Sequence, residues 1–591
     1  MKRIISLLVV LLLTLGLFMG CGGSSDDGTV SNGGSANNGG NNAVGDSALS
    51  TADVNFVKDG DVVYRIIRHD GDEVATSVSQ YLFKQFKDKL KINVRNAADT
   101  EDGTDQYEIL VGMTNREESK TAAAYLEGKT GGRYDDYVIC TIGKKICIYS
   151  KNPDVLKTAA EYFIENYAKA DGVKGGIAYT KGAEGNFENI TVNGVNIGKF
   201  NFVRPHYNSS WLTEVEMEKI VETVYQKTGY KLAINHDSYV QPEEYEIIVG
   251  DTSREGVEKI TNYDEFKITV SGKKVYLNGG SAHATAMAVS EFAKLLKGDV
   301  KDAASYTGSY ETAMNSYDKS TTFYKTWGDD FDGTALDTTK WGQQTESNRT
   351  AGQNGKTSVR SSDPNDVFVA DGKFYICARE DEHYYYGGMI RTQNIMNYKY
   401  GYAEISSVIP HGDSFWIAWW ACSSDSVASI DSSLPKIMSP EIDIVECFGN
   451  SKSYAANCHS WPTTYGKDIY GYEHTSLDGA TYGSDKKYTC PDDILGNAFH
   501  TYGFLWTPEE MSFTCDGDMF FTYKTNTNEA DIETFNHSMY FIYSMALAFE
   551  NAPGNPITTN PEDWQNTNKL ILDWLNLYQK DDGVHELDWK L

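Results

Sequence analysis

The distribution of hydrophobic and polar positions divides the chain into regions of different texture. An apolar run follows Lys2 and Arg3, and residues 22–51 are mostly Gly, Ser, Asn and Asp with almost nothing to bury. Residues 53–300 mix short apolar runs with the three- and four-residue apolar spacings typical of helices. From about residue 315 almost to the C-terminus, short alternating runs are separated by Gly, Asn, Asp and Pro, which predicts an all-β sandwich or barrel.

The middle region contains an internal repeat. The run YEILVGMTNRE at 107–117 returns as YEIIVGDTSRE at 245–255. An alternating strand around Gly-Lys-Lys follows each copy, and a helical pattern follows each strand, at 156–167 and 284–296. This order predicts two small α/β modules, over residues 53–181 and 198–300. Neither copy repeats an acid pair, a nucleophile or a metal cluster, so we expect a scaffold or glycan-contact role for both.

The N-terminus predicts export. Residues 1–20 have the layout of a secretory signal peptide, and the segment ending at Cys21 resembles a bacterial lipoprotein processing site, although Phe18 departs from the usual small aliphatic residue. We therefore expect lipidation of Cys21, a flexible linker over residues 21–52, and a bacterial cell-surface lipoprotein. The alternative is cleavage of an ordinary signal peptide and secretion.

Eight further cysteines follow Cys21, which makes nine in all. Cys140 and Cys147 bracket a turn symmetrically, so we expect them to face each other across a hairpin. Cys447 and Cys458 flank a loop. Outside the cytosol such cysteines form disulfides, whereas in a reducing habitat they remain small buried hydrophobic residues, and the sequence leaves both outcomes open.

The composition favours a neutral partner. The chain of 591 residues has a formal net charge of −30, and 13% of its residues are aromatic. Its negative charge repels phosphate backbones and anionic headgroups, so we expect no nucleic-acid partner and no membrane contact except through the lipid anchor. An uncharged glycan fits this surface, and the length predicts several domains.

The candidate chemistry lies in the run EIDIVE at 441–446. Strand alternation places Glu441 and Asp443 on one face and Glu446 on the other. A β-bulge at Ile444-Val445 would return Glu446 to the first face, so that all three acids converge. Retaining glycosidases need two carboxyl groups about 5 to 5.5 Å apart, one ionised and one protonated. The alternatives for such an acidic patch are a solvated edge strand or a calcium site.

The run EIDIVE is similar to the ExDxxE signature of family-16 glycoside hydrolases, the laminarinase, agarase and carrageenase group. Supporting runs lie in the same order across residues 318–580, namely WGDDFDGTALDTTKW at 327–341, YKYGYAEISSVIP at 398–410, FWIAWW at 415–420, FHTYGFLWTPEEMSFTCDG at 499–517 and LILDWLNLYQ at 570–579. The resemblance implies a concanavalin-like β-jelly-roll sandwich with an open cleft, and an endo-acting, retaining double displacement. The predicted fold is therefore multidomain, with two small α/β modules before a C-terminal jelly roll.

The same resemblance implies roles for the acids and their neighbour. Glu441 matches the nucleophile, Glu446 the general acid/base and Asp443 the assisting carboxyl group. His459 matches the family histidine beside the acids. No cofactor is required for this chemistry.

Aromatic and metal positions are implied in the same way. Trp416 and Trp420 match aromatic residues that line the sugar-binding cleft of the family, whereas Trp419, of opposite parity, is expected in the core. The family often carries a structural Ca²⁺ ion, and Asp573 matches the position of one of its ligands.

Three departures from laminarinases concern the substrate. Ile417 stands where those enzymes usually have Pro, Ser460 where Trp often follows the histidine, and Ser544 where Asn is usual. Our leading hypothesis is an endo-hydrolase of β-1,3- or mixed β-1,3/1,4-glucan. A galactan hydrolase of the agarase, porphyranase or carrageenase type and a non-catalytic cell-surface glycan-binding protein are the alternatives, and the balance between hydrolysis and transglycosylation is open.

Overall fold

The computed structural model describes residues 44–103, 106–344, 349–351, 355–410, 415–423, 437–448, 452–463, 481–482, 487–490, 495–526, 532, 535–547 and 568–589. The predicted signal peptide, Cys21 and residues 22–43 of the predicted linker lie outside these ranges. Across the described ranges, no helix has the length and apolar character needed to span a bilayer. The chain divides into two compact units, one of residues up to 189 with 222–232 and one of residues 190–221 with 233–591.

The first α/β module is built around a mixed sheet with the order β4-β3-β5-β7-β6-β8. Helices α1 and α3 cover one face of the sheet and α2 covers the other, which buries both faces. Asp72 and Asn152 begin α1 and α3 by accepting hydrogen bonds from main-chain N–H groups of the first helical turn. The elements are β3 (Tyr64–Arg68), α1 (Glu73–Gln85), β4 (Arg95–Ala98), β5 (Tyr107–Val111), α2 (Glu117–Thr130), β6 (Tyr137–Ile142), β7 (Lys145–Ser150), α3 (Pro153–Asn166) and β8 (Ala178–Lys181), with a small ribbon of β1 (Val57–Lys58) and β2 (Asp61–Val62) before them.

The end of the predicted linker belongs to this module. The main-chain N–H of Ser50 donates a hydrogen bond to the carbonyl oxygen of Thr141, 2.7 Å away. Val44 and Leu49 pack against the hydrophobic cluster under α2. The expectation of a flexible spacer up to residue 52 is therefore wrong for residues 44–52, because two apolar side chains there find a surface to bury.

The second module repeats the sheet order of the first, as β12-β11-β13-β15-β14-β17. Helix α5 packs on β14 and β15, in the place that α3 takes in the first copy. Residues 256–264 contain no helix, so this module has no counterpart of α2. The elements are β9 (Thr191–Val192), β10 (Val195–Asn196), β11 (Asn201–Arg204), α4 (Trp211–Thr228), β12 (Ile234–His236), β13 (Glu246–Val249), β14 (Glu265–Ser271), β15 (Lys274–Gly279), α5 (Ala282–Leu295), β16 (Asp299–Val300), β17 (Tyr306–Ser309) and α6 (Tyr310–Met314).

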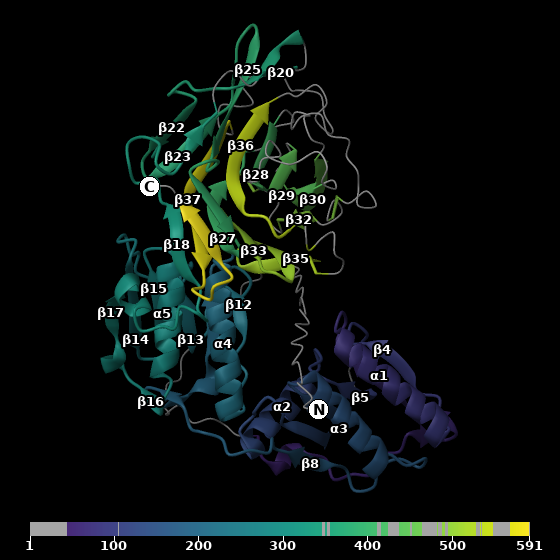
Figure 1. Ribbon diagram of the computed structural model, residues 1–591. Helices are drawn as coiled ribbons and strands as arrows, with labels where there is room; N and C mark the ends of the chain where they lie inside the picture. Colours follow the sequence, from purple (N-terminus) through teal and green to yellow (C-terminus); the bar gives the residue numbers. More distant parts are fainter. Residues whose placement is uncertain are drawn as a thin grey trace, which may run out of the picture. The chain divides into compact units, whose positions relative to one another are not determined.

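The C-terminal region is a sandwich of two largely antiparallel sheets, as predicted. Figure 1 shows β36, β28, β29 and β30 side by side in one sheet and β37, β27, β33 and β35 in the other. One large hydrophobic core fills the space between the sheets. The first sheet contains β19 (Gly342–Gln343), β20 (Arg349–Ala351), β21 (Thr357–Arg360), β24 (Arg379–Glu380), β25 (Tyr384–Arg391), β26 (Met396–Lys399), β28 (Phe415–Ser423), β29 (Ile437–Phe448), β30 (Ser453–Thr463), β31 (Thr481–Tyr482), β32 (Lys487–Thr489), β36 (Met539–Leu547) and β38 (Glu586–Trp589). The second contains β18 (Tyr324–Asp329), β22 (Val367–Ala370), β23 (Lys373–Cys377), β27 (Gly401–Val408), β33 (His500–Trp506), β34 (Glu510–Cys515), β35 (Asp518–Lys524) and β37 (Lys569–Gln579).

The second module and the sandwich share buried polar contacts. Arg204, which is 1% exposed, donates a hydrogen bond to the side chain of Asp518 at 2.7 Å and one to the main-chain oxygen of Asp516 at 2.9 Å. Ser210 donates to Glu404 at 2.8 Å. Buried charges are costly unless they are paired, so these contacts bind the module specifically to the outer side of β27 and β35.

Cys140 and Cys147 lie directly opposite each other on β6 and β7, which confirms the predicted hairpin. Cys140, Cys147, Cys377, Cys422, Cys490 and Cys515 are free thiols, and all of these except Cys422 are buried.

Candidate active site

The acidic strand β29 carries the β-bulge that the sequence predicts. Trp419 of β28 lies opposite Val445, but the next residue, Trp420, lies opposite Asp443, so Ile444 is an extra residue in β29. The pairing of β29 with β30 shifts at the same point. The bulge at Ile444-Val445 is therefore confirmed from both neighbouring strands.

The bulge changes which side chains share a face. Ile444 and Val445 are both 1% exposed and belong to the core between the sheets. Because two successive apolar residues turn inward, the acids before and after them lie on the same outer face. Glu441, Asp443 and Glu446 are thus brought together on the face of the sheet away from the core.

Glu446 is held by two donors. The indole Nε1 of Trp416 donates to one carboxyl oxygen at 3.2 Å, and the side-chain amide of Asn457 donates to the other at 3.1 Å. Burial, followed by the charge of Asp443, raises the pKa of Glu446 to about 7, while His459 and the two donors oppose the rise. This carboxyl group is therefore largely protonated below about pH 7.

Asp443 and His459 form the second contact of the site. Nε2 of His459 lies 2.8 Å from a carboxyl oxygen of Asp443. Burial raises the pKa of Asp443 to about 7 and lowers the pKa of His459, although the charges of Glu441 and Glu446 partly offset the effect on the histidine. The polar atoms of Glu441, Asp443 and His459 all lie within 4.8 Å of one another, so this group has the donors for a cation as well as for proton transfer.

Asn457 is a site residue that the sequence reasoning missed. It lies on β30 opposite Asp443, and it precedes His459 by two residues. Side chains two residues apart on a strand share a face. The spacing between Asn457 and His459 is therefore the signal by which the sequence identifies Asn457.

The tryptophans of β28 have the predicted parity. Trp419 is 1% exposed and lies in the core, whereas Trp416 and Trp420 are half-buried on the other face. Trp420 packs with Met389 and Ile542, and the ring of Trp416 contributes its N–H to an acid of the site. Two flat aromatic side chains therefore flank the acids.

The three departures from laminarinases differ in their relation to the acids. Ile417 is 1% exposed in the core, so it does not face the acids. Ser544 is on the same face as Glu446, because it lies opposite Ala418, which in turn lies opposite Glu446. The side chain of Ser460 is outside the described residues. Ser544 is the departure whose position bears on the substrate.

Asp573, the predicted calcium ligand, forms an ion pair in the structure. Its carboxyl oxygen lies 3.2 Å from Nζ of Lys373. Calcium takes six to eight oxygen ligands, and main-chain carbonyl oxygens are among them. The role of Asp573 as a calcium ligand therefore stays a prediction.

A second converging group of side chains lies elsewhere in the sandwich. His500, Cys515 and Asp516 are buried, and Nδ1 of His500 lies 2.7 Å from Asp516. The other oxygen of Asp516 accepts hydrogen bonds from the main-chain N–H groups of Asn208 and Thr501. This group joins the second module to the sandwich rather than facing solvent.

Comparisons with known proteins find one matching family model and several curated relatives. The family model "Beta-porphyranase A-D, GH16 domain" matches residues 323–580. The "Glucan endo-1,3-beta-glucosidase A1" of Niallia circulans is 25% identical over 280 residues, which cover 43% of this chain and 37% of the relative. The "Endo-1,3-1,4-beta-glycanase ExsH" of Rhizobium meliloti (strain 1021) is 25% identical over 209 residues, which cover 35% of each chain.

A shorter curated relative and a solved structure also match this chain. The "Beta-glucanase" of Rhodothermus marinus is 23% identical over 269 residues, which cover 44% of this chain and 87% of the relative. The solved laminarinase of the same organism is 23% identical, with a TM-score of 0.35, over 44% of this chain and 98% of that one. The alignments span about a third of the length of the first two curated relatives.

Proposed function

Residues 323–580 of this chain are a domain of glycoside hydrolase family 16, and from this premise we propose that the protein is a retaining, endo-acting glycosidase that cleaves a β-linked polysaccharide. The β-bulge of β29 carries the proposal, because beside it Glu441, Asp443 and Glu446 share one face. Like-charged carboxyl groups so close together oppose one another's ionisation. Such a patch is costly for structure alone and useful for acid/base chemistry.

In the first step, the protonated Glu446 donates its proton to the glycosidic oxygen while the carboxylate of Glu441 attacks the anomeric carbon. The bond to the leaving sugar breaks, and a covalent glycosyl-enzyme forms on Glu441. The pKa of Glu446, raised to about 7, supports its assignment as the acid, because the group is protonated when substrate binds.

In the second step, the ionised Glu446 takes a proton from water, and the oxygen of that water attacks the anomeric carbon and releases Glu441. If a second sugar replaces the water, the product is a longer chain, which is transglycosylation. Asp443 acts on both steps through its charge beside Glu446 and its contact with His459. Trp416 and Trp420 provide flat apolar faces for sugar rings.

We propose β-1,3- or β-1,3/1,4-glucan as the substrate. The names of the curated relatives, a glucan endo-1,3-β-glucosidase and an endo-1,3-1,4-β-glycanase, support this choice. A galactan hydrolase is the second candidate, because the matching family model is named for β-porphyranases and Ser544 departs from the laminarinase pattern beside Glu446.

The test is the release of reducing sugar by the purified full chain from laminarin, lichenan, agarose, porphyran and carrageenan. We expect release from a glucan, its loss in Glu441→Gln, and a decrease of about 10²–10⁴-fold in Glu446→Gln. The anomer released first, followed by NMR, is expected to be β. Binding without turnover on every substrate would show a glycan-binding protein, and an α-anomer first would exclude the double displacement.

We also propose that Cys21 is lipidated and holds the protein at the bacterial surface. The support is the segment that ends at Cys21 and the polar residues that follow it. Labelled fatty acid is expected in the wild-type chain and not in Cys21→Ser, and release of the wild-type chain into the medium would show simple secretion.

A further inference from the structure

The two α/β modules differ most on one face of their sheets. In the first module, α2 covers this face, and Leu110, Cys147 and Cys140 form a row of opposed residues across β5, β7 and β6 beneath it. All three are fully buried. The next row on the same face, Tyr149 and Val138, is buried as well.

The second module leaves the corresponding face without a helix. The repeat places Ile248, Tyr276 and Thr269 in the row that the first module fills with a leucine and two cysteines. Tyr276 and Thr269 are half-exposed there. Asn278 and Lys267 form the next row, where the first module has tyrosine and valine. The loss of the helix is thus matched by polar residues, which is the pattern of a face that meets water or a polar ligand.

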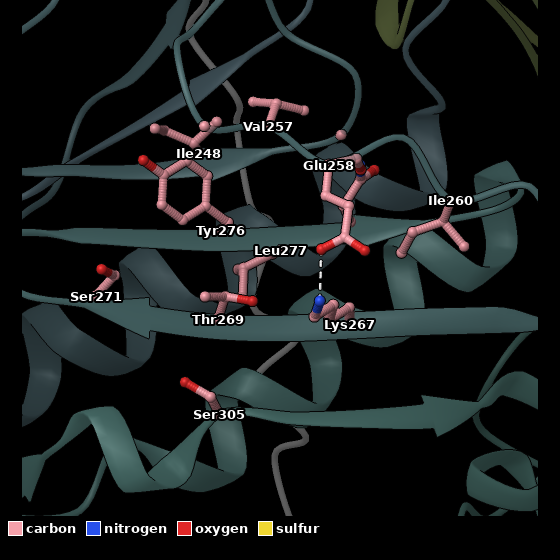
Figure 2. A pocket seen from close by; sticks show the side chains of 13 residues that line it. Ile248, Val257, Glu258, Ile260, Lys267, Thr269, Ser271, Tyr276, Leu277 and Ser305 are labelled. Atoms are coloured by element: carbon pink, nitrogen blue, oxygen red, sulfur yellow. Dashed lines mark hydrogen bonds and ion pairs between the residues drawn. The ribbon is translucent and has the colours of Figure 1, made fainter.

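A cavity of about 380 Å³ lies on this face of the second module. Residues of the segment that replaces α2, among them Val257, Glu258 and Ile260, form its wall above the sheet. Figure 2 shows Tyr276 and Thr269 on neighbouring strands of the floor and the ion pair of Glu258 with Lys267 at one side. The volume is within the range of small-ligand sites.

The lining combines three kinds of group. Tyr276 presents an aromatic ring, and its hydroxyl donates to the main-chain oxygen of Glu255 at 3.2 Å. Thr269 and Ser271 add hydroxyl groups that both donate and accept hydrogen bonds, whereas the hydroxyl of Ser305 is bonded to the main chain of Val270. The only cationic side chain in the lining, Lys267, is paired with Glu258. The cavity is therefore close to neutral, polar at its floor, and supplied with one flat ring.

We propose that this cavity is a non-catalytic binding site for a neutral polysaccharide chain. A sugar chain offers hydroxyl groups to Thr269 and Ser271 and an apolar ring face to Tyr276. A phosphate or nucleotide would need an unpaired cation or a glycine-rich anion loop, and the lining provides neither. The identity of the polysaccharide rests on the proposed function, and the existence of the site does not.

The experiment measures retention of the full chain on insoluble β-1,3-glucan and on agarose. All variants carry Glu441→Gln, so that the matrix is not degraded. We expect Tyr276→Ala to weaken retention by about tenfold, as the loss of an aromatic anchor does. Thr269→Arg, which fills the cavity from a half-exposed position, is expected to act in the same direction. Tyr239→Ala is the matched control, because Tyr239 is a 58% exposed tyrosine of the same module outside the lining.

Three outcomes separate the site from the catalytic cleft and from other occupants. With Glu441 restored, Tyr276→Ala is expected to hydrolyse a short soluble oligosaccharide at the wild-type kcat/KM, and a decrease there would overturn a separate site. Retention unchanged in Tyr276→Ala and Thr269→Arg would also overturn it. So would a change from dimer to monomer in Tyr276→Ala by light scattering, because the face would then bind a second copy of the chain. If the wild-type chain hydrolyses no polysaccharide, the proposed function fails. The retention measurement still tests whether the cavity binds a polysaccharide.

Discussion

At the scale of single residues, Glu446 is the group whose ionisation we expect to limit activity at high pH. Burial and the charge of Asp443 raise its pKa to about 7, and the hydrogen bonds from Trp416 and Asn457 lower it. The general acid must be protonated to act. We therefore expect kcat/KM to fall as the pH rises above about 7.

Removing a donor to Glu446 is expected to move this decline to higher pH. Asn457→Leu removes a hydrogen bond that favours the ionised carboxylate, so the pKa of Glu446 rises, by about one unit for a bond to a charged group. The measurement is the pH profile of kcat/KM. Trp420→Phe is the control, since it changes a ring on the same face and is expected to lower the rate without moving the profile. A decline that moves to lower pH in Asn457→Leu would contradict the assignment of Glu446.

Asp443→Asn is expected to move the decline of kcat/KM at high pH in the opposite direction, to lower pH. The negative charge of Asp443 raises the pKa of Glu446. Replacing Asp443 by the neutral asparagine therefore lets Glu446 lose its proton at lower pH. The variant also removes an ionisable partner of His459, so we expect a lower maximal rate as well. An unchanged profile with a lower maximum would leave Asp443 a positioning residue only.

The sequence predicted the bulge that brings the acids together, but it did not predict all of the buried contacts. Parity along β29 requires a bulge if Glu446 is to join Glu441, and the structure has that bulge. Asn457 was within reach of the same parity argument, through His459. The contact of Glu404 with the second module was not predictable, because its partners Ser210 and Trp211 lie about 190 residues away along the chain and meet it only in the folded molecule.

At the scale of elements, the two inward residues of the bulge in β29 are expected to be indispensable. Deleting both Ile444 and Val445 places Glu446 directly after Asp443, so strand alternation turns Glu446 toward the core. We expect activity to fall at least as far as in Glu446→Gln, about 10²–10⁴-fold, together with a lower melting temperature because a charge is buried without a partner. Deleting Ile444 alone is the matched control, because one inward residue then remains between the acids and Glu446 keeps the outer face. Activity close to wild type after the double deletion would refute the parity argument.

Helices were predicted less completely than strands. The patterns that predict α3 and α5 have apolar residues at regular helical spacing, and both helices form. Helix α2 was missed because its buried face is small, with Ala122, Tyr125 and Leu126 among charged and polar neighbours. Its effect is visible instead on β6, which is buried along almost its whole length because helices cover both of its faces. The absence of α2 from the second module could not be inferred before α2 itself was known.

At the scale of the whole molecule, buried carboxyl groups link stability to pH. Glu404 is fully buried at the contact between the sandwich and the second module, and burial raises its pKa to about 7. Burial also raises the pKa of Glu214 in the second module to about 7, although the charge of Arg204 opposes the rise. The folded chain therefore holds protons that the unfolded chain has already released at neutral pH.

This linkage makes the folded protein less stable as the pH rises toward neutral. A folded pKa above the unfolded value means that the stabilising contribution is complete below about pH 4.5 and is lost as the pH rises through about 7. For Glu404 alone the loss is on the order of 3 kcal/mol of unfolding free energy. We expect the melting temperature to fall from pH 5 to pH 7.5, and Glu404→Gln to flatten this decrease, because glutamine keeps the shape and has no charge to bury. Glu382→Gln, at an exposed position of the same sandwich, is the control expected to keep the wild-type slope. An equal slope in Glu404→Gln would mean that the charge of Glu404 is solvated in the folded protein, and that the contact between the second module and the sandwich opens to water.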